Sequence, residues 1–253
     1  MPIELFARPD RGPFISAHRG YSAVAPENTL AALEAALEAG AHVAEIDVKL
    51  TRDGQLVLMH DATLERTTDG RGPVSALTLA EIRTLDAGSW FDRKFAGTRV
   101  PSLDEVLAWS RGRLGILVEM KNCPERDPKF IDETIAAIER NNAVDFAIPA
   151  GFDHPALAEI HQRRPAWTLE MIAPCRLVDP VHAARRCGAR LLSLEPEYTV
   201  AADVREMHAA GLSVLTTLLS VEHGRELYEM GIDFFESKDV QMARDALRAL
   251  GRG

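Results

Sequence analysis

Short apolar runs alternate along this chain with longer stretches in which apolar residues recur every three or four positions. Apolar runs of this length are typical of buried strands, and the three-to-four spacing is typical of helices that bury one face. The runs predict strands at Phe14–Ala17, Val43–Val48, Arg113–Glu119, Phe146–Pro149, Thr168–Ile172, Arg190–Leu194, Ser213–Thr217 and Asp233–Phe235. Strands that alternate with helices favour a parallel sheet.

An amphipathic stretch follows most of these runs, and the first is the clearest. Leu30, Leu33 and Leu37 fall on one helical face. Asn28 is expected to cap the start of this helix, and Gly40 ends it. Further helices are predicted at Ile131–Arg140, Pro155–Gln162, Ala201–Ala210, Val221–Met230 and Val240–Leu250.

Eight strand–helix units in 253 residues predict an α/β fold, a TIM (β/α)8 barrel that forms one domain over residues 1–253. The alternative is a doubly wound open sheet, which usually has fewer strands and carries a Gly-rich phosphate loop that is missing after the first strand here. Residues 61–101 break the pattern with several turn signals and one short helix near Leu79–Leu85. We interpret them as a small insertion after the second strand.

Composition and charge restrict the partners. The formal net charge is −9, from 29 Lys and Arg against 38 Asp and Glu, so nucleic acid is not an expected partner. A phosphate-bearing small molecule would need local positive charge. No apolar run approaches the roughly 20 residues that span a bilayer, so no stable membrane insertion is expected. The three cysteines form no CxxC pair, which favours a reducing compartment and a cytoplasmic location. No feature fixes an oligomeric state.

The active site of a TIM barrel lies at the C-terminal ends of its strands. The first predicted strand ends in His18-Arg19-Gly20, and the planar guanidinium of an arginine suits phosphate oxygens. The second carries Glu45 and Asp47, which are two residues apart and therefore face the same side. On a strand that faces solvent, two such carboxylates would simply be hydrated, but a barrel strand has the core on one side and helices on the other. A hard cation, Mg²⁺ or Ca²⁺, relieves the repulsion between them.

Two further groups belong to the same end of the barrel. Asp53-Gly54 predicts a tight turn, which would bring His60 back towards the second strand as a general acid or base. Glu119 and Lys121 share a face at the end of the third strand. Glu119 adds a third carboxylate, and Lys121 adds a second positively charged side chain after Arg19. The alternatives are a buried structural histidine and an ion pair on the barrel rim.

In their order and spacing, these residues resemble the glycerophosphodiester phosphodiesterase family. The matching motifs are His18-Arg19-Gly20, Pro26-Glu27-Asn28-Thr29, Glu45-Ile46-Asp47-Val48, Thr51-Arg52-Asp53-Gly54, His60-Asp61, Leu64-Glu65-Arg66-Thr67-Thr68, Gly70-Arg71-Gly72, Val100-Pro101-Ser102-Leu103 and Glu119-Met120-Lys121. The resemblance implies a TIM barrel with a small insertion after the second strand. It also implies hydrolysis of glycerophosphodiesters to glycerol 3-phosphate and an alcohol, with one divalent cation, Mg²⁺ or Ca²⁺.

The same resemblance implies roles for individual residues. They are Glu45, Asp47 and Glu119 as metal ligands, Arg19 and Lys121 as phosphate contacts, and His18 and His60 as the acid–base pair. Phe152 is expected either to wall the alcohol pocket or to belong to the core. Which histidine is the acid stays open, as does the attacking group, which is water or the 2-hydroxyl of the substrate.

The second half of the chain departs from the family pattern. The stretch 216–220 lacks the tryptophan that commonly lines the glycerol pocket. Glu170 and Glu195, near the ends of the fifth and sixth strands, are expected either to bind substrate hydroxyls or to pair with Arg176 or Arg190.

Two other functions compete with glycerophosphodiester hydrolysis. The nearer is a related phosphodiesterase that acts on lysophospholipids, for which Trp90, Phe91 and Phe95 would supply an apolar patch at the barrel mouth. The farther is a catalytically silent barrel that binds phosphate-bearing ligands. The presence of every implied catalytic residue argues against a silent barrel.

Overall fold

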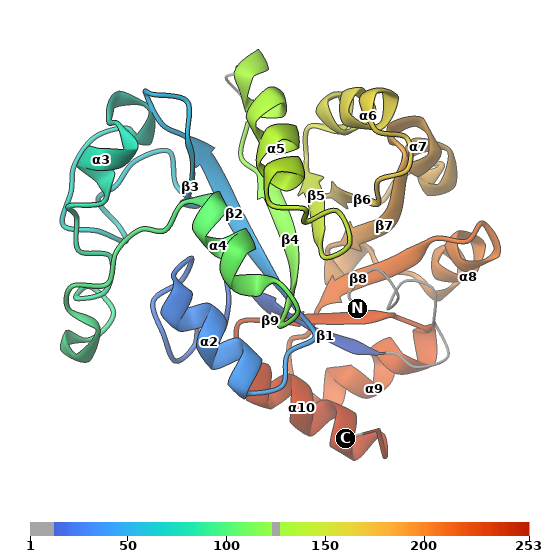
Figure 1. Ribbon diagram of the computed structural model, residues 1–253. Coiled ribbons are helices and arrows are strands. Elements are labelled where there is room, and N and C mark those ends of the chain that lie inside the picture. Colours follow the sequence, from blue (N-terminus) through green and yellow to red (C-terminus); the bar gives the residue numbers. More distant parts are fainter. Residues whose placement is uncertain (1–12, 123–126, 253) are drawn as a thin grey trace.

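A computed structural model describes residues 13–122 and 127–252, and its parallel strands close into a barrel (Figure 1). The barrel strands are β1 (Phe14–His18), β2 (Val43–Leu50), β4 (Gly115–Met120), β5 (Ala147–Gly151), β6 (Leu169–Ala173), β7 (Ala189–Leu194), β8 (Ser213–Thr217) and β9 (Phe234–Ser237). Each pairs in parallel with its neighbour, and β1 pairs with both β9 and β2. This closure confirms the predicted TIM barrel and excludes the open sheet.

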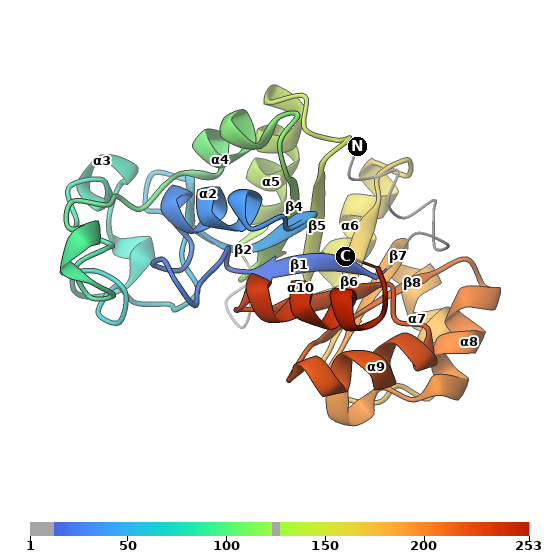
Figure 2. The ribbon, with the colours of Figure 1, turned by 90° about the horizontal axis from the view of Figure 1, so that it is seen from below.

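Helices cover the outside of the barrel (Figure 2). They are α2 (Leu30–Glu38), α4 (Leu103–Ser110), α5 (Pro128–Arg140), α6 (His154–Arg163), α7 (Pro180–Cys187), α8 (Ala201–Ala209), α9 (Val221–Met230) and α10 (Val240–Ala249). Of these, α4 and α7 were not predicted from the sequence. Within the described ranges, no helix has both the length and the apolar character needed to cross a membrane.

The start of α2 differs from the prediction. Its N-cap is Thr29, whose hydroxyl accepts a hydrogen bond from the Ala32 amide, so the assignment of Asn28 as the cap is wrong. Asn28 lies one residue earlier with a φ of 56°, in the left-handed region that asparagine tolerates better than most residues. Its side chain is turned into the barrel, where it binds Asp47.

The barrel interior changes from apolar to polar along the strands. At the N-terminal end, inward-facing residues form one apolar cluster of Phe14, Val43, Leu117, Ile148, Leu191, Leu215 and Phe234. Side chains alternate along a strand, so the residues two positions further on also face inward. On six of these seven strands they are polar: Ser16, Glu45, Glu119, Ser193, Thr217 and Glu236. The strand periodicity therefore builds a polar layer directly above an apolar plug.

The segment between β2 and α4 forms a lobe at the side of the barrel where α2 and α4 lie (Figures 1 and 2). It begins with the predicted hairpin, in which β3 (Leu56–Leu58) runs antiparallel to the end of β2. It continues through η2 (Val74–Ala76), α3 (Leu79–Ile82) and η3 (Arg93–Phe95). The lobe has an apolar cluster of its own, formed by Val57, Met59, Leu64, Val74, Ile82, Ala87 and Val100.

Candidate active site

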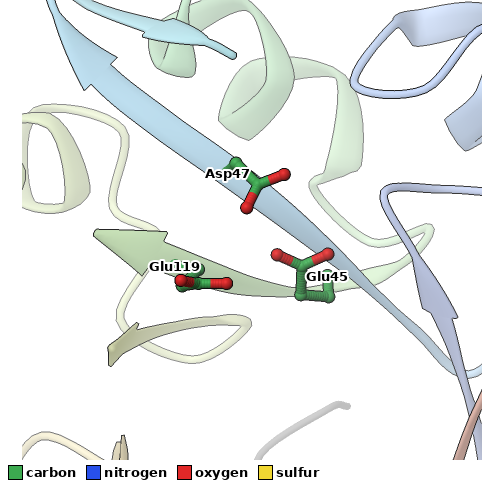
Figure 3. A group of neighbouring side chains, drawn as sticks. All are labelled: Glu45, Asp47 and Glu119. Carbon is green, nitrogen blue, oxygen red and sulfur yellow. The ribbon is translucent and has the colours of Figure 1, made fainter. Parts of the chain in front are cut away.

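Three carboxylates converge at the mouth of the barrel. Glu45 and Asp47 come from β2 and Glu119 from the neighbouring strand β4 (Figure 3). One oxygen from each lies within 4.8 Å of the others, and the residues are only 5%, 0% and 6% exposed. The β2–β4 register places Asp47 directly beside Glu119. The structure thus brings together the three side chains that were predicted as metal ligands.

The electrostatics of this cluster favour a bound cation. Burial and the neighbouring carboxylates raise the pKa of Glu45 well above its usual value, and burial and Asp47 raise the pKa of Glu119. Burial also disfavours ionised Asp47, but the Lys121 and Arg19 cations outweigh it and lower the pKa of that carboxyl. The buried oxygen Glu45 Oε1 accepts no hydrogen bond from the described residues. Three buried oxygen donors with excess negative charge fit a divalent cation.

Arg19 is fixed beside the carboxylates by its own backbone. Its φ of 59° lets its amide N–H donate to Glu45 Oε2 at 2.9 Å, while its side-chain Nε lies 3.2 Å from Asp47 Oδ2. The next residue, Gly20, has a φ of 77°, and a Cβ there would lie 2.7 Å from the Ala32 Cβ. A glycine is therefore required for the tight turn that aims Arg19 at the site.

Asn28 holds Asp47 in place, a role that the sequence analysis did not identify. Its Nδ2 donates to Asp47 Oδ2 at 2.8 Å, and its Oδ1 accepts from the Asp47 amide at 3.0 Å. Both residues are buried. This reciprocal pair orients one carboxylate of the candidate metal site, as outer-shell partners of metal ligands commonly do.

Replacing Asn28 by alanine is expected to weaken cation binding by about 10-fold to 100-fold, because Asp47 loses the amide that orients it. Measuring the unfolding temperature at increasing concentrations of Mg²⁺ or Ca²⁺ gives this affinity. Asn28→Gly is the matched control, since glycine relieves the left-handed backbone but also lacks the amide. A glycine variant with wild-type cation affinity would contradict the role of the side chain.

His60 belongs to a chain of charged contacts that reaches Arg19. Its Nδ1 lies 2.6 Å from Asp61 Oδ1, and Arg66 bridges Asp61 to Glu27 with Nε 2.7 Å from Asp61 Oδ2. Glu27 Oε1 in turn accepts from Arg19 Nη1 at 2.9 Å. With its Nδ1 bound to a carboxylate, the ring of His60 is held in a fixed orientation.

His18 lies beside the carboxylates, at the end of β1. Its Nε2 is 4.0 Å from Glu45 Oε2. Burial, with the nearby charge of Arg19, lowers the pKa of His18 to about 4. His18 and His60 are both close enough for their charges to act on Asp47, so the two predicted proton carriers lie near the same carboxylate cluster.

Lys121 and Phe152 complete the predicted set. The Lys121 ammonium pairs with Glu119 and lies 3.0 Å from Asp47 Oδ1. It also lies 5.8 Å from the centroid of the Phe152 ring. Phe152 is 43% exposed, so its side chain belongs to the wall of a cavity and not to the core.

That cavity has a volume of about 260 Å³ and opens beside His18. It is acidic, because Glu170, Glu195 and Glu236 line it together with Ser193 and Thr217. Burial and repulsion from Glu236 raise the pKa of Glu170 to about 8, and burial raises that of Glu236 to about 7.

The alternative ion-pair role for Glu170 and Glu195 is not realised. Arg176 binds Asp203 instead, with Nε 2.8 Å from Oδ2. Within residues 13–122 and 127–252, neither glutamate pairs with an arginine. The Oε2 of Glu170 is buried without a hydrogen-bond partner among these residues. This leaves it available to a ligand in the cavity.

The aromatic residues of the side lobe pack on one another. The rings of Trp90 and Phe91, and of Phe91 and Phe95, are edge-to-face at centroid distances of 5.7 Å. None of the three lines the acidic cavity. An apolar chain held by these rings would therefore lie outside the acidic cavity.

Comparison with known proteins places the chain in a family. Residues 18–234 match the Glycerophosphoryl diester phosphodiesterase family. The chain is 40% identical over 185 residues to a glycerophosphodiester phosphodiesterase of Caldanaerobacter subterraneus subsp. tengcongensis, a match that covers 73% of this chain and 75% of that protein.

Solved structures agree. A phosphodiesterase of Oleispira antarctica in complex with the product sn-glycerol-3-phosphate has a TM-score of 0.87 at 29% identity, over 93% of this chain and 97% of that one. A glycerophosphodiester phosphodiesterase of Agrobacterium tumefaciens has a TM-score of 0.79 at 30% identity, over 91% and 98%. The chain belongs to the glycerophosphodiester phosphodiesterase family of hydrolases.

Proposed function

We propose that this chain hydrolyses glycerophosphodiesters to glycerol 3-phosphate and an alcohol, with His18 and His60 as its proton-transfer pair. The observation that carries the proposal is the buried cluster of Glu45, Asp47 and Glu119, with His18 and His60 both close enough to act on Asp47. The cluster would hold one divalent cation, and its all-oxygen donor set suits Mg²⁺ and Ca²⁺ alike. When bound, such a cation offsets negative charge on the phosphate oxygens.

The residues of the chain itself position the diester and move the protons. Arg19 and Lys121 hold the phosphate oxygens with two fixed positive charges. One histidine accepts the proton of the attacking hydroxyl as a new P–O bond forms, and the other donates a proton to the leaving oxygen as the old P–O bond breaks. The attacking hydroxyl comes from water or from the substrate. If the substrate hydroxyl attacks, a cyclic phosphate forms and water opens it in a second step.

The acidic cavity supports glycerol as the group on one side of the phosphate. Glu170 presents an unpartnered carboxyl oxygen there, and Ser193 and Thr217 add hydroxyl side chains. An acyl chain there would leave the buried Oε2 of Glu170 without a partner, which disfavours a lysophospholipid. Phe152 supplies an apolar wall for the glycerol carbons.

We also propose a cytoplasmic location. The described cysteines Cys175 and Cys187 are free, as is typical of a reducing compartment. Cys123, which follows the site residue Lys121, lies outside the described residues.

The test is a substrate panel with and without a chelator. Glycerophosphocholine, glycerophosphoethanolamine and glycerophosphoglycerol are each expected to release glycerol 3-phosphate with Mg²⁺ or Ca²⁺, and EDTA is expected to stop the release. Lysophosphatidylcholine is expected to react at least about 10²-fold more slowly, because binding it strands buried polar groups. No product with either cation, or faster cleavage of the lysophospholipid, would sink the proposal.

A further inference from the structure

We infer that Lys49 and the groove beside it bind the leaving alcohol, and that they favour alcohols that carry an additional negative charge, a carboxylate or a phosphate. The inference rests on the proposed phosphodiesterase function and names the substrate class that the site prefers.

The strand geometry places Lys49 in the mouth of the barrel. It follows Asp47 by two residues on β2, so it continues the inward face that carries Glu45 and Asp47. In the β2–β4 register Val48 lies beside Met120, which sets Lys49 next to Lys121 on the neighbouring strand. The Lys49 ammonium lies 3.4 Å from the Lys121 carbonyl oxygen, to which it donates.

Lys49 has no carboxylate at ion-pair distance among the described residues, although Asp47, Glu119 and Asp61 act on its charge from farther away. The Lys121 ammonium is held by Asp47 and Glu119, and the Arg52 guanidinium lies 2.9 Å from Glu81 Oε2. Lys49 is half-buried, yet it forms no ion pair with any residue of the part of the chain that the structure describes. Two lysines side by side without a carboxylate for the second are a repulsive arrangement, which a bound anion relieves.

Lys49 lines a groove that differs in character from the acidic cavity. The groove has a volume of about 680 Å³ and is lined on its polar side by Lys49, Thr51, Arg52, Ser75, Lys121 and Asn122. Of the described residues that line it, Asp127 is acidic, and its carboxylate caps α5 by accepting a hydrogen bond from the Lys129 amide at 2.9 Å. Lys49 is thus the cation that the groove presents without an ion-pair partner among the described residues, beside neutral polar groups and the capping carboxylate of Asp127.

The phosphate position connects the two spaces. Lys121 lines the groove, and its ammonium also lies over the ring of Phe152, which walls the acidic cavity. A phosphodiester has one substituent on each side of its phosphorus. With glycerol among the carboxyl and hydroxyl groups of the acidic cavity, the second substituent extends past Lys121 towards Lys49. An anionic substituent is attracted by the Lys49 ammonium in the groove.

The experiment compares two diesters of glycerol 3-phosphate that differ by one charge. One carries 3-hydroxypropanoate as its alcohol, and the other carries the neutral 3-hydroxypropanamide. At low salt the wild-type protein is expected to show a kcat/KM about fivefold higher for the carboxylate, the equivalent of about 1 kcal/mol for one partly exposed charge pair. Lys49→Gln is expected to remove this preference, Lys49→Glu to reverse it, and Lys49→Arg to retain it.

Lys94→Gln is the matched control, because it removes the same charge from an exposed position in the side lobe. Equal loss on both diesters in Lys49→Gln would overturn the inference, since it would mean that Lys49 attracts every phosphodiester alike. A wild-type protein without preference would overturn it as well. If glycerophosphocholine and both diesters stay intact, the proposed function itself fails. Hydrolysis of glycerophosphocholine but of neither diester leaves that function standing and excludes the groove.

Discussion

Replacing His60 by alanine is expected to lower kcat by about 10²-fold or more, and replacing His18 to have an effect of the same size. Each change removes one of the two proton transfers, so the reacting oxygen must exchange its proton with water. The carboxylate cluster, Arg19 and Lys121 stay in place, so KM is expected to change little. Steady-state kinetics with glycerophosphocholine and saturating cation measure both quantities.

The double variant tests whether the histidines act in one reaction. When two groups act as a unit, removing both lowers the turnover by less than the product of the two separate fold-losses. The double variant is therefore expected to lose less turnover than that product. His182→Ala is the matched control, because that histidine is exposed on α7, far along the chain from the site motifs. Wild-type turnover in both single variants, with cation present, would refute the assignment of the pair.

Much of this site could be predicted from strand periodicity. Apolar runs located the strands, and the two-residue repeat along β2 placed Glu45 and Asp47 on one inward face. The parallel register then brings Glu119 beside Asp47, as expected for neighbouring strands that end at the same edge. These predictions depend only on local pattern and on the closure of the barrel, which is why they held.

The two helices that were missed carried their signals at the ends and not in the middle. α4 begins with a capping box formed by Ser102 and Glu105. α7 begins with Asp179 as its cap and ends at Gly188 in the left-handed conformation. Each has only eight residues, too few for the apolar spacing to stand out. Reading the end signals would have found both.

The supporting contacts of the site could not be predicted, because they join residues that are distant in sequence. Arg66 reaches Glu27 across 39 residues, and Asn28 reaches Asp47 across 19. The clamp by Asn28 also requires its left-handed backbone, which no local pattern specifies. Sequence motifs show that such residues are present, but only the fold shows which carboxylate each one holds.

The buried carboxylates of this barrel lower the stability of the cation-free protein, although cation binding requires them. Glu45, Asp47, Glu119, Glu170 and Glu236 lie at one end of it, all with less than a tenth of their surface exposed except Glu236, which is half-buried. Ionised carboxyl groups out of water are unfavourable unless cations or hydrogen bonds offset them. Lys121 and Arg19 offset the charge of Asp47, but the Glu45 oxygen Oε1 has no partner among the described residues. The protein without a cation is therefore expected to be less stable than it would be with a neutral residue at position 45.

Glu45→Gln is accordingly expected to have opposite effects on stability and on activity. Without cation, its unfolding temperature should equal or exceed that of the wild type, because repulsion within the cluster falls while the amide oxygen still accepts from the Arg19 N–H. With cation at 100 times its Kd, the wild type gains about 2.7 kcal/mol of unfolding free energy and the variant gains little. Its turnover is expected to fall by about 10³-fold, as for chelated wild type, because several kcal/mol of charge stabilisation are lost.

Glu34→Gln is the control, since it removes one negative charge from the exposed face of α2. It should keep both the cation response and the turnover of the wild type. Should Glu45→Gln gain as much stability from Mg²⁺ or Ca²⁺ as the wild type does, the cation binds elsewhere on the chain. The opposite signs are the decisive feature. Replacing a carboxylate that merely supported the fold would lower the stability with or without cation. Replacing a metal ligand in a repulsive cluster lowers the stability only when cation is present.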